Sequence, residues 1–165
     1  MKRRGRKGGM VMMADMLELS FVLARARRSL FRWAAQGKYQ DDDAVPLQRG
    51  TAGLAVSPEL HVATERVWML ADPPTLYQQR ALSDVSGLHA AGEPLWLLGE
   101  ECAMDLGLPD YDFWLVDDEY VVLLHYDAEH ALTGGEVLVC APAVACCRRW
   151  RDLALSHSVS VYVAA

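Results

Sequence analysis

The 165-residue sequence lacks the long apolar run and the short motifs that would assign a function directly. No stretch approaches the roughly 20 uncharged residues that a helix needs to cross a bilayer. The sequence also contains no G-x-S-x-G elbow, no Walker loop, no G-x-G-x-x-G fingerprint and no H-E-x-x-H pair. Familiar hydrolase, nucleotide-binding and zinc mechanisms therefore receive no support.

Cysteine is scarce, and its spacing argues against metal binding. The four cysteines have no C-x-x-C spacing, and the five histidines show no ligand spacing with one another or with the cysteines. Cys146 and Cys147 are neighbours in an expected helix, so they point in different directions and cannot readily share a metal ion or bridge each other. We therefore expect reduced, buried thiols, no metal site and no cofactor.

Positive charge is concentrated in the first 38 residues, which hold ten of the sixteen Lys and Arg. The rest of the chain is acidic, and the net charge of the whole is -6. An acidic body repels phosphate backbones, so nucleic acid is a disfavoured partner unless the basic residues near the first helix form one exposed face. Those residues are Arg25, Arg27, Arg28 and Arg32.

The N-terminal run MKRRGRKGG is interpreted as part of a basic disordered leader over residues 1–13. Candidate true starts within it are Met10, Met12 and Met13. Asp15 and Glu18 interrupt the apolar segment that a secretory signal would need. We expect a cytoplasmic protein that has no membrane partner.

The apolar pattern predicts one α+β domain over residues 14–160, with a tail at 161–165. We expect a mixed or mostly antiparallel sheet with a central hairpin, helices packed on it and a C-terminal amphipathic helix. The expected helices are Met12 to Arg28, Asp72 to about Ala91, a turn at EECAMD, and a segment starting at Pro142. The expected strands are SLFRWAAQG, Thr64 to Ala71, EPLWLL, both arms of the hairpin, and Gly134 to Cys140.

The last helix shows the clearest amphipathic pattern in the chain. A spacing of i, i+4, i+7, i+11 predicts that one face is buried. The residues of that face are Cys146, Trp150, Leu153 and His157. Arg148 and Asp152 are expected to form an i, i+4 pair on the opposite face.

The central hairpin is DFWLVDDEYVVLLHYD, residues 112–127. Both parities of its strands are apolar, which predicts burial on both faces of the sheet. Three acids, Asp117, Asp118 and Glu119, lie at the turn. They lack the alternating carboxylates of a calcium loop, so we interpret them as water-exposed turn residues.

The register of this hairpin decides which polar residues meet. With a two-residue turn at Asp118-Glu119, the ladder places Asp112 opposite His125. A carboxylate that fixes one imidazole nitrogen prepares a general base, so Asp112 and His125 form the candidate catalytic dyad. A turn longer or shorter by one residue brings Tyr111 or Phe113 opposite His125 instead.

Four further residues are candidate ligand-binding groups around this dyad. Glu93 follows the expected helix stop at Gly92, where a solvated loop acid is the competing interpretation. The other three lie on or beside the hairpin strands, where aromatic rings and a carboxylate are suited to line a pocket. They are Trp114, Tyr126 and Asp127.

Ordered motifs run through most of the chain, from about Ser29 to His157. They are AGE (Ala91 to Glu93), FWLVDD (Phe113 to Asp118), HYD (His125 to Asp127) and CRRWRDLALSHS in the last helix. In these motifs the chain resembles an actinobacterial family of domains of unknown function, whose members show AGE, FWLFDD, HYD and RDLAW.HA. Leu155 stands where that family has Trp.

The resemblance implies an α+β domain often encoded near helix-turn-helix regulators, and no established activity or catalytic residue. It also implies a distant fold-level similarity to phospholipase-D-like effector domains. This sequence lacks the H-x-K motif of those domains, so it would be a catalytically silent relative.

Two functions from different classes remain open. The leading interpretation is a non-enzymatic regulatory domain of an actinobacterial system, which binds a protein partner, a second copy of itself, or a small-molecule effector. An exposed edge strand or an exposed aromatic patch would be the trace of a homodimer. The alternative is a small enzyme or ligand-binding protein of specialised metabolism that uses the His/Asp pair as acid and base.

Overall fold

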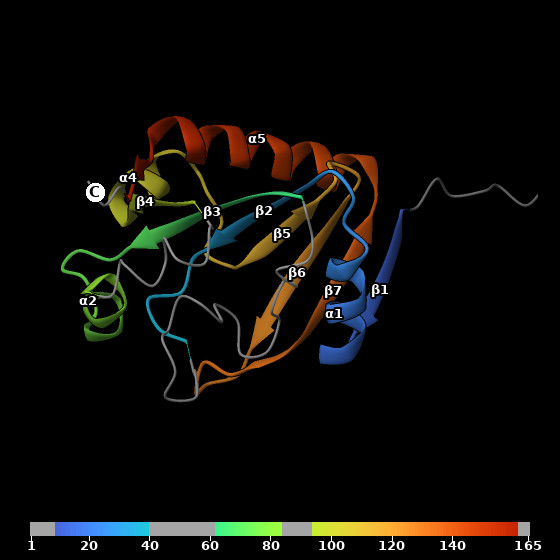
Figure 1. Cartoon of the computed structure of the whole chain (residues 1–165), viewed down its shortest axis with the longest axis horizontal. Coiled ribbons are helices and arrows are strands. Elements are labelled where there is room, and N and C mark those ends of the chain that lie inside the picture. Colours follow the sequence, from blue (N-terminus) through green and yellow to red (C-terminus); the bar gives the residue numbers. More distant parts are fainter. Residues whose placement is uncertain (1–8, 40–61, 84–93, 162–165) are drawn as a thin grey trace, which may run out of the picture.

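An eight-stranded mixed sheet forms the centre of the molecule in the computed structural model, which describes residues 9–39, 62–83 and 94–161 (Figure 1). The strand order is β1-β7-β6-β5-β2-β3-β4-β8. Strands β2, β3 and β4 run parallel to one another, and every other pairing is antiparallel. The strands are β1 (Met10–Ala14), β2 (Ser29–Ala34), β3 (Ala63–Leu70), β4 (Leu95–Gly99), β5 (Phe113–Val116), β6 (Tyr120–Tyr126), β7 (Leu132–Val139) and β8 (Val159–Ser160).

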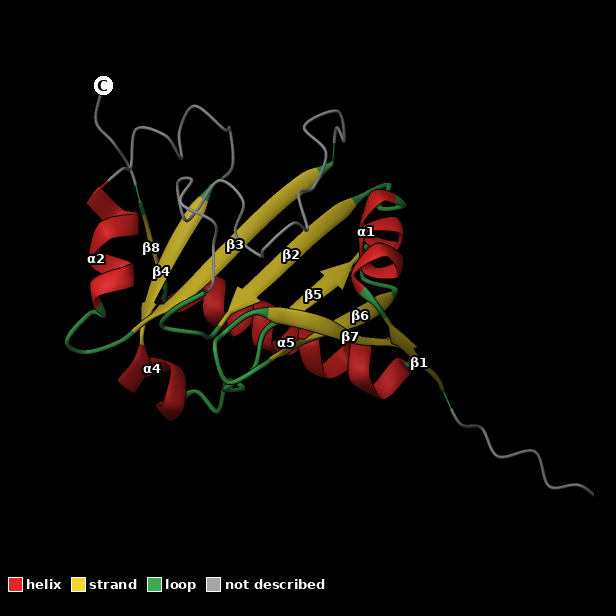
Figure 2. Cartoon of the chain, turned by 90° about the horizontal axis from the view of Figure 1, so that it is seen from below, coloured by secondary structure: helices red, strands yellow, loops and turns green. Residues whose placement is uncertain are grey.

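Helices lie on both faces of this sheet (Figure 2). Helix α5 crosses one face, and α1 covers the other face near β1 and β7. The described helices are α1 (Met16–Ala24), α2 (Leu76–Ser83), α4 (Glu100–Asp105) and α5 (Ala141–His157). No helix in the described part of the chain is both long and apolar enough to cross a membrane. The α+β class, the mostly antiparallel sheet and the C-terminal helix are confirmed.

Alternating side chains of the central strands form two apolar layers. Phe31, Phe113 and Val121 pack with α5, and Leu30 and Trp114 pack on the α1 face. All four residues of β5 are buried, and β5 lies between β6 and β2. The prediction of a central hairpin buried on both faces is therefore confirmed.

The N-terminal prediction needs a correction at residues 10–13. They form most of strand β1, which pairs antiparallel with β7, instead of belonging to a leader. The first helix accordingly begins later than expected, at Met16. Asp15 caps it, because its side chain accepts the Glu18 N–H while the Glu18 side chain accepts the Asp15 N–H. Residues 1–8 lie outside the described residues.

The buried stripe of α5 is offset from the predicted one. Val144, Cys147 and Ala154 are buried, whereas Cys146 and His157 are exposed. The periodicity of apolar residues indicates how wide the buried stripe of a helix is, but not which way the stripe faces. On α5 the small residues Cys147 and Ala154 face the sheet. The expectation of buried thiols holds at Cys147, where burial raises the pKa to about 12, and is wrong at Cys146.

Arg148 and Asp152, the ion pair predicted on α5, have other partners in the structure. Arg148 Nε lies 3.7 Å from Asp118 Oδ2 in the hairpin turn. Asp152 instead accepts from Arg151 Nε at 2.9 Å. The turn acid is a partner for both arginines, since Arg151 also contacts Asp118.

The hairpin loop has three residues, Asp117, Asp118 and Glu119, and is one residue longer than the predicted turn at Asp118-Glu119. Glu119 donates its N–H to the Val116 carbonyl at 2.9 Å, and Asp117 and Asp118 have positive φ, 54° and 58°. Positive φ at both positions is the geometry of a type I′ turn, which matches the twist of the paired strands. The ladder therefore pairs Val116 with Tyr120 and Trp114 with Val122.

Substitution of Gly135 tests the close packing of β7 against β6. A Cβ at this position would lie 2.1 Å from the Leu123 carbonyl oxygen, so backbone must shift. We expect Gly135→Ala to lower the free energy of unfolding by about 2–3 kcal/mol in urea denaturation. Gly99→Ala is the control: a Cβ there meets no heavy atom within 4 Å, and loss of a glycine N-cap costs at most about 1 kcal/mol. Equal effects of the two substitutions would contradict the proposed β6–β7 packing.

Candidate functional site

Asp112 lies at the centre of a buried polar cluster on the α1 face of the sheet, with no exposed surface. Its Oδ1 accepts the Ala35 N–H at 2.7 Å. Its Oδ2 accepts hydrogen bonds from the Tyr39 hydroxyl at 2.8 Å, the Tyr126 hydroxyl at 3.1 Å and an Arg32 Nη at 3.3 Å. One carboxylate therefore connects β2, the segment after it, and the end of β6.

Arg32 supplies the positive charge of this cluster and is 1% exposed. Its guanidinium lies 5.4 Å from the ring centroid of Tyr39 and 5.6 Å from that of Trp114. Burial alone would lower the pKa of Arg32, but the surrounding phenols and the Asp112 carboxylate raise it above its ordinary value. Arg66, also buried, is its register partner on β3.

The two phenols of the cluster are held in their neutral, donating form. Burial, followed by the negative charge of Asp112, raises the pKa of both Tyr39 and Tyr126 well above the ordinary value. Neutral phenols and a charged guanidinium all donate to one acceptor, which keeps the buried charge paired and hydrogen-bonded. The cluster is thus arranged to hold the fold together, and its carboxylate has no exposed surface for a substrate.

The structure does not bring Asp112 and His125 together, so the predicted dyad geometry is wrong. The Asp112 carbonyl accepts the Leu124 N–H, and His125 pairs with Gly134 on β7. The His125 imidazole lies 2.9 Å from Glu136, with nearly half of its side chain exposed. Because successive side chains of a strand point to opposite faces, the one-residue shift moves His125 away from Asp112.

The predicted ligand-binding residues do not lie together at one site. Tyr126 belongs to the Asp112 cluster, and Trp114 packs against Arg32 in it. Asp127 instead organises its own exposed turn, where its carboxylate accepts the N–H groups of residues 129 and 131. Glu93 lies outside the described residues. Sequence reasoning missed Arg32 and Tyr39, although an arginine within the apolar run SLFRWA requires a buried acceptor and signals one.

Asp117 has a second structural role that the sequence did not reveal. Its carboxylate accepts the backbone N–H groups of Arg27, Arg28 and Ser29 at 2.6–3.1 Å. Burial would raise the pKa of Asp117, but these backbone hydrogen bonds, with the charge of Arg28, lower it below the ordinary value. The prediction of an exposed turn residue is therefore wrong for Asp117, which is 7% exposed.

The acids of the turn are matched by cations of the chain itself. Glu119 accepts from an Arg28 Nη at 2.5 Å, and Asp118 contacts Arg148 and Arg151. Among the described residues, no group of three His, Cys, Asp or Glu side chains is arranged to hold a metal ion.

The four basic residues near the first helix do not form the single exposed positive face that nucleic-acid binding would require. Arg32 is buried in β2 rather than displayed on a helix. Arg28 is engaged by Glu119 and by the Asp117 carbonyl. Arg25 and Arg27 are exposed, but two cations do not form a continuous positive face.

An exposed apolar surface lies at the β1 end of the sheet. We call it the β1–α1 surface, and it comprises Met10, Val11, Met12, Met13, Leu17 and Phe21. These side chains are between 45% and 71% exposed. Isolated exposed apolar residues are ordinary, but six large ones on two adjacent elements are typical of an interaction site. In the sequence this surface corresponds to the apolar run MVMMADMLELSF, which spans the end of the predicted leader and the start of the predicted first helix.

The groove between β1 and α1 gives this surface its shape. Two hollows of about 430 and 520 Å³ lie there and share the lining residues Met12, Val22, Arg25 and Val137. The smaller hollow is also bordered by Phe21 and Glu18. Apolar side chains thus line the groove, and charged side chains rim it.

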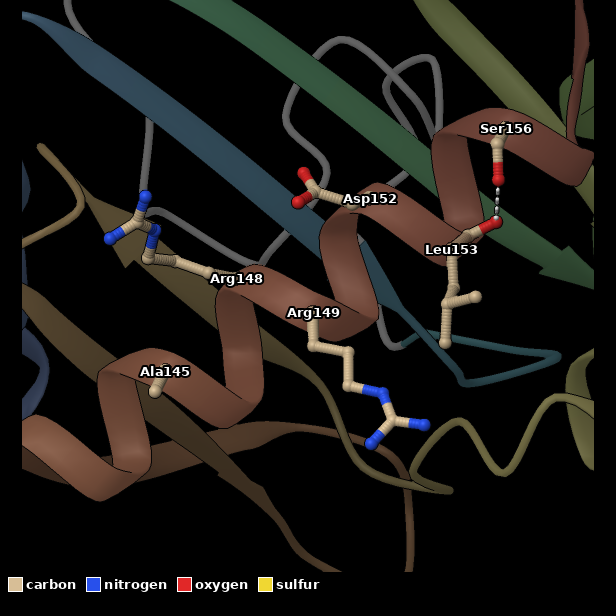
Figure 3. A pocket seen from close by; sticks show the side chains of 6 residues that line it. All are labelled: Ala145, Arg148, Arg149, Asp152, Leu153 and Ser156. Atoms are coloured by element: carbon tan, nitrogen blue, oxygen red, sulfur yellow. Dashed lines mark hydrogen bonds between the residues drawn. The ribbon is translucent and has the colours of Figure 1, made fainter.

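A third hollow, of about 540 Å³, lies along the outer side of α5. Figure 3 shows its side chains spread along one helix, with Arg148 and Arg149 pointing apart. The Ser156 hydroxyl donates to the Leu153 carbonyl of the same helix. Such a surface offers no converging set of polar groups for a ligand.

The arrangement of strands and helices is similar to the folds of two solved bacterial proteins. Nuc from Salmonella typhimurium, a phospholipase D family member, matches with a TM-score of 0.60 and 11% identity, covering 94% of this chain and 99% of Nuc. NucT from Helicobacter pylori matches with a TM-score of 0.60 and 11% identity, covering 92% of this chain and 97% of NucT. No curated protein matches the sequence.

At the level of sequence, residues 18–162 match the model of a domain of unknown function, DUF6879. The chain belongs to that family. The match spans the sheet from β2 onward together with most of α1 and all of α5, whereas β1 precedes it.

A double-mutant cycle tests the partners of Asp112. We expect Asp112→Asn to lower the free energy of unfolding by about 3–5 kcal/mol, because it leaves the Arg32 guanidinium buried without a countercharge. Tyr126→Phe should show a coupling energy with Asp112→Asn of about 0.5–3 kcal/mol. His125→Ala, measured by the same urea denaturation, should be additive with Asp112→Asn within about 0.5 kcal/mol. Coupling at His125 and additivity at Tyr126 would contradict the observed register.

The pH dependence of stability tests the role of Asp117. Because folding lowers its pKa, the carboxylate stabilises the fold fully above its ordinary value of 3.8, and this stabilisation is lost as pH falls through the folded-state value. We expect Asp117→Asn to cost about 1 kcal/mol at pH 7, and the difference from wild type to shrink on acidification. Glu119→Gln, at an exposed acid, is the control. A cost of Asp117→Asn that stays constant from neutral to acid pH would exclude the charge as its cause.

Proposed function

We propose that this chain is a non-enzymatic, partner-binding domain of a regulatory system, and that it binds a protein through the β1–α1 surface. The observation that carries the proposal is the extent of that surface, where the side chains of Met10 to Met13 are all exposed. A groove lined by apolar residues and rimmed by Arg25 and Glu18 supports a protein partner, because its core is apolar and its border is charged.

The polar residues of the sheet argue against a hydrolytic role. The proteins that share this fold include a phospholipase D family member, but the present sequence has no H-x-K motif. The most buried acid in the described part of the chain, Asp112, accepts hydrogen bonds from four donors of the chain itself. His125 has a carboxylate within hydrogen-bond reach, yet it lines none of the three hollows described above. These residues support a silent relative of the fold better than an acid-base enzyme.

Site-specific photo-crosslinking in cells of the source organism tests this proposal. A benzoylphenylalanine at Phe21 reports on the β1–α1 surface, and one at Met104 is the control, because Met104 is similarly exposed on α4. We expect irradiation to link Phe21 of the full chain to one defined protein, identified by mass spectrometry, and to link Met104 to none.

The proposal also requires that the crosslink depend on the surrounding surface. Met12→Lys places a charge within the groove and should remove the crosslinked product from Phe21. The equivalent substitution Met104→Lys should leave the product unchanged. No product at Phe21, or a product that survives Met12→Lys, would refute binding through this surface.

A further inference from the structure

Strand β1 ends the sheet on one side and is unusually open for an edge strand. It has five residues, MVMMA, with no charge, no proline and an unbroken register against β7. The opposite edge strand, β8, has only two residues. Proteins normally shorten, charge or bend their edge strands to prevent pairing with another chain. Strand β8 follows that rule and β1 does not.

We propose that β1 pairs antiparallel with β1 of a second copy of this chain, so that two sheets join into one across a twofold axis. The inference rests on the proposed function, because it names the partner of the β1–α1 surface. An exposed strand edge presents a row of backbone N–H and C=O groups, and another strand satisfies that row most completely.

The charges that flank β1 favour the antiparallel direction and a partner identical to the chain itself. Five basic residues precede the strand, Lys2, Arg3, Arg4, Arg6 and Lys7. Two exposed acids, Asp15 and Glu18, follow it. In an antiparallel pair the start of each strand meets the end of the other, so the basic flank of one copy approaches the acidic flank of its partner. A parallel pair would bring like charges together.

Residues beside β1 extend the same interface on the α1 face. Phe21 is 62% exposed and borders the groove that Met12 also lines. Leu17 lies one helical turn before Phe21 and is 65% exposed. A twofold axis through β1 brings both copies of this apolar set to the same side of the joined sheet.

Sedimentation of the full chain tests the pairing. We expect a particle of twice the 18.3 kDa chain mass at about 100 µM, where a dimer with micromolar affinity is filled. Val11→Lys combined with Met13→Lys should raise the dissociation constant at least about tenfold, because like charges then face each other across the axis. Met104→Lys, at a comparably exposed methionine of α4, should leave it unchanged. Circular dichroism and thermal unfolding verify that each variant is folded.

Disulfide scanning determines the direction of pairing. Single cysteines replace Met10, Val11, Met12 or Met13 in a Cys146→Ser background, which removes the exposed native thiol. Antiparallel pairing predicts that self-crosslinking peaks at one position next to the axis and falls on both sides of it. Comparable crosslinking at all four positions indicates a parallel pair and overturns the proposal.

The outcomes separate this inference from the proposed function. A monomer at about 100 µM, or a dimer indifferent to the lysine pair in β1, overturns self-pairing. If Phe21 then crosslinks to a different protein in cells, partner binding through the β1–α1 surface stands and only the identity of the partner changes. If Phe21 crosslinks to nothing, both proposals fail.

Discussion

The Asp117 carboxylate sets the register on which the rest of the site depends. It accepts three backbone N–H groups at the start of β2, which holds the left-handed conformation of its own residue in place. Asp118 follows in the same conformation, and the two residues form a tight turn. Such a conformation is costly for residues other than glycine, so it persists where surrounding contacts over-determine it. The hydrogen bonds to the β2 entry supply those contacts, and with them the pairing of β5 against β6.

This register decides whether Asp112 forms a catalytic pair with His125 or a structural cluster with Arg32 and Tyr126. Asp112 lies just before β5 and faces the side of the sheet that Arg32 and Tyr126 also face. A hairpin loop one residue shorter would have placed His125 opposite Asp112 instead. The same carboxylate would then have had an ionisable, half-exposed neighbour suited to proton transfer. With arginine and two neutral phenols around it, the carboxylate accepts four hydrogen bonds from the chain and has no exposed surface. Buried ion pairs of this kind specify an arrangement more than they stabilise it, because desolvation offsets much of their attraction.

The sequence carried enough information for the architecture and too little for the site. Long apolar elements such as β3, β7 and α5 are marked by periodicity and by breakers at their ends, and these were predicted within a few residues. The register was not, because both parities of the hairpin are apolar and either one satisfies burial. Strand β1 was missed for a related reason: a methionine-rich run suits a helix, and only pairing with β7 makes it a strand. Asp117 was read as a turn former, which it is, but its long-range acceptor role depends on residues ninety positions away.

The buried charges at the centre of the sheet are paired with other groups of the chain, so the edges of the sheet are the places where another molecule can bind. The central strands are buried on both faces, and the Asp112 carboxylate accepts its hydrogen bonds from the chain itself. At the margins, β8 is too short to recruit another strand, while β1 combines unpaired backbone with exposed apolar side chains. An uncharged edge of that length is an aggregation hazard unless a specific contact covers it, because pairing of bare edges is otherwise open-ended. Pairing across a twofold axis hydrogen-bonds the β1 edge of both copies, and the short β8 strands are then the two edges of the joined sheet. The geometry that makes β1 a liability in a lone chain therefore makes it a closed, self-limiting interface in a pair.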